Sequence, residues 1–387
     1  MDRVYLDWNA TAPLRPEARD AMIAALGVAG NPSSVHGEGR AARRLVEEAR
    51  AKVAALVGAE LEQVTFTSGG TEANMLALTP ALTGPGNNLP RDRLLISAIE
   101  HTSVRSGGRF PANAAEEIPV SAAGAVDLDA LRAMVAKGGR PLVSIMLANN
   151  ETGVIQPSTQ AAQIVHDAGG LLHVDAVQGP GRIVCDIDAL GADLLTISAH
   201  KLGGPKGVGA LIRRREPLHI AEPLIKGGGQ ERGARAGTEN VAGIAGFGAA
   251  AEVAAKALKR EAAHMAALRD SLEAGLKRIS PDGIIFGSAS ERLPNTTLFT
   301  APGMKAETAV IAFDLDGIAV SSGAACSSGK VQPSHVLAAM GVDGAAARGA
   351  VRVSLGPTST ESDVERFLKA WIKLSESLRK GRQGMAA

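Results

Sequence analysis

The sequence predicts an α/β protein whose mainly parallel sheet is covered by helices on both faces. Short apolar runs alternate with segments of helical spacing along most of the chain, and several apolar runs end in polar residues and glycines. Such alternation is typical of strand–helix–strand units, whose parallel strands are buried on both sides. The 387 residues suffice for two domains and a large core.

The first elements are predicted to be helices. Pro16 suits the first turn of a helix over residues 16–25. The turn and cap residues of 31–34 lead into a long amphipathic helix that extends through residue 57.

Seven strands and several helices are predicted after this point. The strands are expected at residues 63–67, 93–97, 117–120, 142–148, 171–175, 193–198 and 207–212. Helical spacing marks residues 128–136, where Asp127 can cap the helix, and residues 158–168, where Ser158 can do so. Residues 227–237 are predicted to form a loop, 239–279 a long alanine-rich helix and 359–380 a last helix.

Composition and charge exclude several classes of protein. With 41 basic and 40 acidic residues, the formal charge of +1 does not suggest nucleic-acid binding. The start of the chain lacks the apolar core of a signal peptide. The apolar stretch 241–258 contains Glu252 and Lys256 and predicts a buried helix rather than a membrane span. Two cysteines are too few for a disulfide framework, so we expect a cytoplasmic protein.

A lysine follows one of the predicted buried strands. Ser198, His200 and Lys201 lie where the run 194–198 gives way to glycines. A lysine at the carboxyl end of a buried strand can face a ligand crevice, where desolvation lowers its pKa and makes the amine nucleophilic. The alternative is a solvated surface lysine, the commonest fate of a lysine.

The preceding strand ends in Asp175, with Gln178 three residues further on. An aspartate and a lysine at neighbouring strand ends suit pyridoxal 5′-phosphate (PLP). The lysine forms a Schiff base with the aldehyde, and the carboxylate keeps the pyridine nitrogen protonated, so that the ring accepts electrons. His173 shares a strand face with Asp175, but no third ligand at a recognisable spacing joins them, so a metal site is rejected.

Three further motifs have both a functional and a structural interpretation. Gly70 and Thr71 follow a strand and open a helix, where backbone amides suit a phosphate; in isolation an ordinary threonine-capped turn is favoured. His101 follows a strand end and either stacks on a cofactor ring or is a polar crevice residue. Residues 149–153, which include Asn150, either bind a ligand or cap a turn.

The two cysteines lie in different surroundings. Cys185 belongs to an apolar run and is predicted to be a small core residue. Cys326 lies in the serine- and glycine-rich segment 320–330, close to Lys330. A loop of this composition should expose its cysteine, and the nearby lysine favours the reactive thiolate.

Taken together, these motifs resemble the cysteine desulfurases, PLP enzymes of the class V aminotransferase group. The resemblance covers almost the whole chain in order, and its remaining segments are 5–7, 67–72, 100–101, 235–240 and 352–356. The form of the Cys326 segment resembles the long-loop branch, which includes nitrogen-fixation and housekeeping iron–sulfur enzymes. The expected fold is PLP fold type I: a large PLP-binding domain over 15–255, and a small α+β domain from 1–14 and 256–387 that carries the cysteine loop.

The resemblance also implies roles for single residues. Lys201 would form the Schiff base, Asp175 would hold the pyridinium and His101 would stack on the ring. Gln178 and Asn150 would contact the cofactor, and Asn150 would also lie near the substrate. The phosphate would be bound by Gly70, Thr71, Ser198 and His200. Thr238 would reach the phosphate of the other subunit, which implies a homodimer, and Arg352 would clamp the substrate carboxylate.

The implied reaction converts L-cysteine to L-alanine. The Cys326 thiolate would attack the substrate sulfur, and the resulting persulfide would pass to a sulfur acceptor such as an iron–sulfur scaffold protein. Ala12 departs from the family pattern, which commonly has a threonine there. Three alternatives remain: a selenocysteine lyase or other β-eliminating enzyme, a simple aminotransferase, and a catalytically idle docking protein. The Cys326 loop argues against the two enzymes, and the presence of Lys201 argues against the docking protein.

Overall fold

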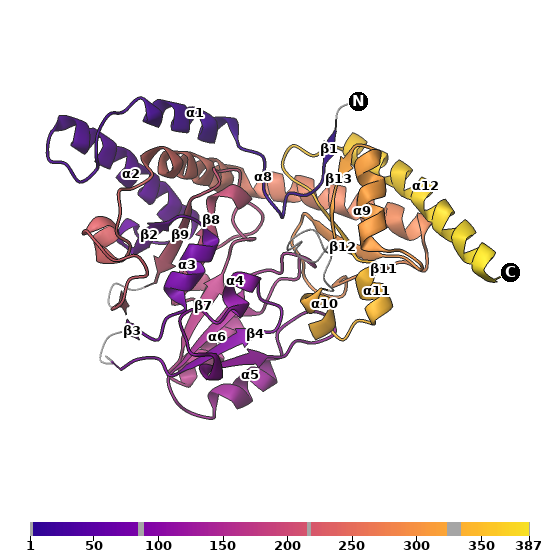
Figure 1. Cartoon of the computed structure of the whole chain (residues 1–387), viewed down its shortest axis with the longest axis horizontal. Helices are drawn as coiled ribbons and strands as arrows, with labels where there is room; N and C mark the ends of the chain where they lie inside the picture. Colours follow the sequence, from indigo (N-terminus) through magenta and orange to yellow (C-terminus); the bar gives the residue numbers. More distant parts are fainter. Residues whose placement is uncertain (1–2, 84–88, 215–217, 323–333, 387) are drawn as a thin grey trace.

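The computed structural model describes residues 3–83, 89–214, 218–322 and 334–386, the last six as backbone alone. Figure 1 shows two bodies joined by one long helix, with a sheet and its helices on one side and the C-terminal elements on the other. The N-terminal segment passes between the two bodies. The expected arrangement of a large α/β part and a smaller domain is therefore confirmed.

The larger body is built on a seven-stranded sheet, and all seven predicted strands are confirmed. The strand β9 is antiparallel to both of its neighbours, and the other pairings are parallel. Strand β5, predicted at residues 117–120, begins two residues earlier, at Ala115. In sheet order the strands are β2 (Val64–Thr67), β9 (Gly209–Arg213), β8 (Leu194–Ser198), β7 (Leu171–Asp175), β6 (Pro141–Met146), β4 (Arg93–Ser97) and β5 (Ala115–Ile118).

Both faces of this sheet are buried, because successive strand residues point into different cores. Leu94 and Leu95 belong to separate hydrophobic clusters, as do Leu194 and Leu195. The helices that accompany the sheet are α1 (Pro16–Leu26), α2 (Gly37–Leu56), α3 (Gly70–Ala77), α4 (Thr102–Arg105), α5 (Leu128–Val135), α6 (Ser158–Asp167) and α7 (Ile187–Leu190). Short 3₁₀ helices lie at Leu61–Gln63, Ala112–Ala114, Ala199–Lys201 and Gln230–Gly233, and β3 (Leu82–Thr83) pairs with β10 (His219–Ile220).

Two expected helix caps are wrong and one is confirmed. Asp127 caps α5 through its carboxylate. Helix α2 begins later than the turn at 31–34 suggested, because the ring of His36 accepts the Gly39 N–H and serves as its cap. Ser158 is the first residue of α6 rather than its cap, since its hydroxyl donates to the Gln156 carbonyl.

The smaller body contains a four-stranded antiparallel sheet. Its strands, in order, are β11 (Ile284–Ile285), β12 (Thr296–Thr300), β15 (Val351–Ser354) and β14 (Ser321–Ser322), and β1 (Val4–Tyr5) pairs in parallel with β13 (Ile318–Ala319). The helices are α9 (Ala306–Leu315), α10 (His335–Ala339), α11 (Gly344–Arg348) and α12 (Glu361–Ala386). Phe299, Phe313, Phe367 and Trp371 form an aromatic core between sheet and helices, with Phe313 stacked on Phe367.

Helix α8 (Val241–Ile279) connects the two bodies. Ile244 and Phe247 pack in the core of the large sheet, whereas Leu268 and Leu272 pack in the aromatic core. By length and composition α8 could cross a membrane, but 56% of its most apolar window is buried inside the molecule. It is therefore a core helix, as predicted. The proposed domain boundary at residue 255 falls inside it and stays a prediction.

Candidate active site

A cavity of about 440 Å³ lies at the carboxyl ends of the large-sheet strands and is bordered on its other side by Ser321 and Arg352 of the small domain. Its size is that of an ordinary cofactor or ligand pocket, and its place is where open α/β sheets bind ligands. Of the predicted site residues, it is lined by Gly70, Thr71, His101, Asn150, Asp175, Gln178, Ser198, His200, Lys201 and Arg352. Thr238 is exposed and is not in this lining, and Cys326 lies outside the described residues.

Lys201 extends into the cavity from the 3₁₀ turn that directly follows β8. Its Nζ donates hydrogen bonds to the carbonyls of Asn9 at 2.6 Å and Ala10 at 2.9 Å. Burial, and to a smaller degree the charges of Arg352 and Arg182, lower the pKa of this amine to about 7 against the opposite effect of two aspartates. A large fraction of the amine is therefore neutral, and so nucleophilic, at neutral pH.

Asp175 and His101 are linked by a chain of hydrogen bonds. The Asn74 amide Nδ2 donates to Asp175 Oδ2 at 2.8 Å and to Ser103 Oγ at 2.9 Å. Ser103 Oγ in turn lies 2.8 Å from His101 Nδ1, which also accepts the Ser103 backbone N–H. The Ser103 hydroxyl therefore donates to Nδ1, which leaves Nε2 as the protonated nitrogen of the neutral ring.

Another end of the cavity offers small residues and donors at the start of α3. Gly70 leaves room there, because a Cβ at this position would lie 3.0 Å from the Val177 side chain. His200 Nδ1 lies 3.2 Å from Thr11 Oγ1, and burial together with Lys201 lowers its pKa to about 4, so that the ring is neutral. Backbone amides at a helix start and neutral polar groups suit a phosphate.

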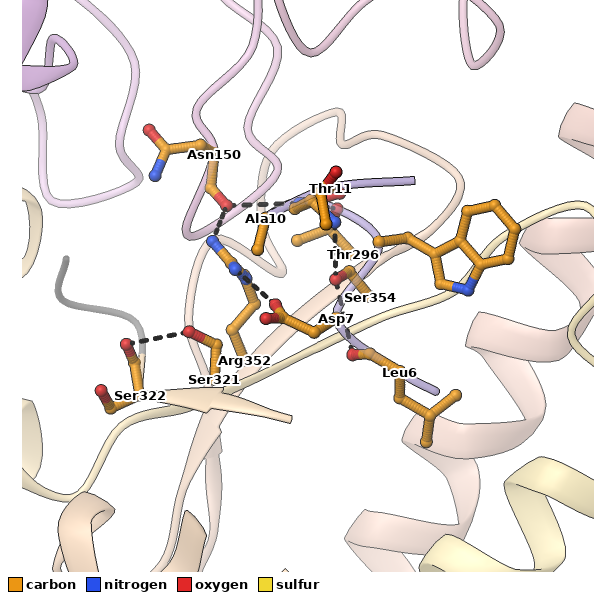
Figure 2. A network of polar contacts seen from close by, with 12 residues as sticks. Leu6, Asp7, Ala10, Thr11, Asn150, Thr296, Ser321, Ser322, Arg352 and Ser354 are labelled. Carbon is orange, nitrogen blue, oxygen red and sulfur yellow. Dashed lines mark hydrogen bonds and ion pairs between the residues drawn. The ribbon is translucent and has the colours of Figure 1, made fainter. Parts of the chain in front are cut away.

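The small domain contributes Arg352 from β15. The residue is 5% exposed, and its guanidinium donates to Asp7 Oδ1 at 2.7 Å and to the Asn150 carbonyl at 2.9 Å. Figure 2 shows the guanidinium held between these two groups. The Nε of Arg352 has no hydrogen-bond partner among the described residues.

Several lining residues were not predicted as site residues. Asn9 and Ala10 belong to an irregular segment without strand or helix periodicity, so nothing in the sequence placed them beside Lys201. Asn74 lies one helical turn beyond Thr71, and Ser103 lies two residues beyond His101. Helical spacing from Thr71 is the signal that points Asn74 toward the same side of α3.

Two residues that the sequence separated from the site lie in the core. His173 is buried between Ser144 Oγ and Thr196 Oγ1, at 2.8 and 2.9 Å, and burial lowers its pKa to about 4. Cys185 is 3% exposed, and burial raises the pKa of its thiol. Within the described ranges no group of three metal-ligating side chains is present.

The cavity fits a polar cofactor by its own chemistry. The side-chain oxygens Asn74 Oδ1 and Gln178 Oε1 are buried without partners among the described residues, as is Arg352 Nε. Buried polar atoms without partners are rare and costly, so a ligand that pairs with them would stabilise the site. A partly neutral lysine, a buried carboxylate and backbone amides at the start of a helix together match pyridoxal 5′-phosphate.

Comparisons with known proteins show the family to which this fold belongs. The chain matches the family model described as Aminotransferase class-V over residues 4–367, and it belongs to this PLP-dependent family. The large sheet with Asp175 and Lys201 at its strand ends is thus the scaffold of a class V enzyme.

Within that family the chain belongs to the cysteine desulfurases of the IscS and NifS type. It is 43% identical over 386 residues to a cysteine desulfurase of Cereibacter sphaeroides, covering 98% of this chain and 97% of the relative. It is 42% identical to cysteine desulfurase IscS of Dictyoglomus turgidum, covering 97% and 95%. A solved NifS-like protein from Rickettsia africae superposes with a TM-score of 0.86 at 37% identity, covering 97% of this chain and 99% of that chain.

Proposed function

We propose that this enzyme converts L-cysteine to L-alanine and collects the sulfur as a persulfide on Cys326. The observation that carries the proposal is a single cavity that combines a partly neutral Lys201, the buried Asp175 and the unpaired Nε of Arg352. These groups suit an amino acid substrate. Its amino group would lie at the Lys201 end of the cavity, and its carboxylate would meet the guanidinium of Arg352. A relative at 28% identity and TM-score 0.75, covering 92% of this chain and all of that chain, is described as SspA in complex with cysteine.

Nine residues would hold the cofactor or the substrate next to it. Asp175 would pair with the pyridine nitrogen, with Asn74 fixing its carboxylate, and His101 would lie over the ring. Gln178 and Asn150 would contact polar atoms of the ring, and Gly70, Thr71, Ser198 and His200 would bind the phosphate. When bound, pyridoxal 5′-phosphate supplies an aldehyde that condenses with amines and a ring that accepts an electron pair from the substrate Cα.

The remaining steps belong to the side chains of the protein. Arg352 binds the substrate carboxylate and fixes the direction of the Cα–H bond, and Lys201 Nζ takes up that proton as a general base. The Cys326 thiolate attacks the substrate sulfur, the Cβ–S bond breaks and its electron pair remains with carbon. Proton return to carbon completes L-alanine, and Cys326 keeps the transferred sulfur as a persulfide.

The proposed setting is a cytoplasmic homodimer that supplies sulfur for iron–sulfur clusters or other acceptors. Thr238 is exposed on its own chain, which supports a role at the phosphate of a second copy. Arg235, three residues earlier, pairs with Glu72 in the first turn of α3 at 3.0 Å. This ion pair holds the segment close to the proposed phosphate site, where a dimer would place it between two cavities.

The test compares the two cysteines of the chain. Holoenzyme incubated with L-cysteine should form L-alanine, and trapping with an alkylating reagent should find the persulfide on Cys326. We expect Cys326→Ala to lose both products and Cys185→Ala, the matched control, to keep them. Undiminished alanine and sulfide formation by Cys326→Ala would remove the persulfide route and favour simple β-elimination.

A further inference from the structure

The N-terminal segment 7–12, called the strap below, forms one wall of the cavity, although none of its side chains is assigned a role in the reaction. Asn9 and Ala10 line the cavity, while Trp8 and Ala12 line a second cavity of about 200 Å³ on the other side. Lys201 contributes to both linings. The strap thus separates the two spaces directly beside the reactive amine.

Asp7 begins the strap and lies behind Arg352 rather than in the cavity lining. It forms an isolated parallel bridge with Ser354, two residues after Arg352 on β15. Backbone hydrogen bonds from Ser354 N to Leu6 O at 2.8 Å and from Trp8 N to Ser354 O at 3.3 Å fix this register. The register sets the Asp7 carboxylate against the guanidinium, as Figure 2 shows.

The strap itself is held firmly on both sides of Asp7. Asn9 is 1% exposed, and its backbone and side chain hydrogen-bond to residues of both bodies: Ser354, Thr296 and Asn295 in the smaller, and Asn150, Gln178 and Lys201 in the larger. Trp8 packs on Gly356 so closely that a Cβ there would lie 2.0 Å from the indole. The Asp7 backbone therefore has little freedom to follow a moving arginine.

The contacts of Arg352 divide its N–H groups into two sets. Asp7 and the Asn150 carbonyl occupy Nη2 and Nη1, whereas Nε is buried and unpartnered among the described residues. A guanidinium is a planar fork, so fixing two of its nitrogens fixes the direction of the third. Arg352 lines the cavity, and the N–H groups left for a carboxylate there are Nε and the second hydrogens of Nη1 and Nη2.

We propose that Asp7 is a positioning residue for substrate specificity: by holding Arg352, it makes the enzyme select amines that carry an α-carboxylate. This inference rests on the proposed function, in which Arg352 binds the carboxylate of L-cysteine. Without Asp7 the arginine side chain keeps its charge but loses its fixed direction. Binding of the carboxylate should weaken, whereas binding of the amine end, which depends on the large sheet, should not.

The test compares L-cysteine with cysteamine, which is L-cysteine without its carboxylate. The visible absorption of the holoenzyme is titrated with each amine, and the ratio of the two half-saturating concentrations is measured. We expect Asp7→Ala and Asp7→Ser to reduce the preference for L-cysteine about tenfold, the scale of a charge-assisted hydrogen bond, while cysteamine binding stays within about twofold. Asp7→Asn retains an acceptor for Arg352 and should restore most of the preference.

The matched control is Asp314→Ala, which removes an exposed aspartate–arginine pair with Arg3 in the same domain. This variant should leave the half-saturating concentrations of both L-cysteine and cysteamine unchanged. Equal weakening of both amines in the Asp7 variants would show a merely structural role and overturn the inference, as would unchanged or tighter L-cysteine binding. Failure of the wild-type holoenzyme to respond to L-cysteine would instead contradict the proposed function.

Discussion

The two walls of the cavity are built in different ways. On the large-sheet side, Asp175 ends the buried strand β7 and Lys201 follows its neighbour β8, and Asp175 sits in a parallel register with Thr196. On the small-domain side, Arg352 comes from a short antiparallel sheet and is held by Asp7 in an irregular segment. The first wall is positioned by regular hydrogen bonding, the second by single side-chain contacts.

This difference suggests a division of work between the walls. Packed parallel strands keep their ends fixed, which suits a cofactor that stays bound through every turnover. A wall held by a few polar contacts between separate segments can be tuned to a substrate by changing single residues. We therefore expect substitutions on the large-sheet side to affect cofactor chemistry, and those on the strap side to affect substrate recognition.

The largest effect is expected for Lys201→Ala. Removing the amine takes away both the cofactor attachment and the proposed general base, so turnover of L-cysteine should fall by about 10³-fold or more. Lys206→Ala, an exposed lysine of the same segment, is the control and should keep its rate. Alanine formation measured for both variants decides the outcome; substantial turnover by Lys201→Ala would contradict its role.

The second prediction contrasts two aspartates at opposite ends of the sheet. Asp175→Asn, at the carboxyl end of β7, should lower turnover about 10²-fold, because a neutral amide cannot hold a protonated ring nitrogen. Asp193, just before β8, pairs with His166 at 2.8 Å and accepts the Leu172 N–H. Asp193→Asn should lower the free energy of unfolding and leave turnover within about threefold; the reverse pattern would break the comparison.

On the other wall, Gly356→Ala should displace Trp8. The added Cβ would lie 2.0 Å from the indole, so the strap must shift, at a cost of about 1–3 kcal/mol in the free energy of unfolding. We expect KM for L-cysteine to rise several-fold and the affinity for the cofactor to change little. Gly229→Ala is the control, since a Cβ there meets nothing within 4 Å. Urea unfolding and initial rates measure the two effects.

The smallest effect concerns Glu151, next to Asn150. Burial raises the pKa of this carboxyl to about 7, against the opposing effects of the Ser334 hydrogen bond and Arg352. Its ionisation thus disfavours the folded state as pH rises from about 4.5 to 7. Glu151→Gln should raise the melting temperature by about 2 °C or more at pH 8 and much less at pH 5. An equal shift at both pH values would contradict this.

The sequence predicted one wall much better than the other, for a physical reason. Continuous apolar runs of strand length, bounded by turn residues, are typical of buried strands, so the strand ends that position Asp175 and Lys201 could be located from the sequence. Arg352 was expected only through the family resemblance, because nothing in its own strand marks it as a site residue. The contacts of Asp7 and Asn9 with residues more than a hundred positions away depend on tertiary packing, which no local pattern encodes.

The same limit explains the errors in local structure. The caps of α2 and α6 were assigned to serines and asparagines by their general preference. In the structure His36 caps α2, and the Ser158 hydroxyl at the start of α6 donates to the Gln156 carbonyl. Preferences for caps are weak beside specific tertiary contacts. The wrong caps shifted helix starts without changing the order of the elements.

The most direct test of the division between the two walls is a pair of affinities measured on two variants. The dissociation constant for pyridoxal 5′-phosphate and the half-saturating L-cysteine concentration are determined for wild type, Ser198→Ala and Arg352→Lys. The account predicts weaker cofactor binding in Ser198→Ala with little change in the L-cysteine response, and the opposite in Arg352→Lys. If both variants weaken both affinities to the same degree, the walls act as one unit and the division is wrong.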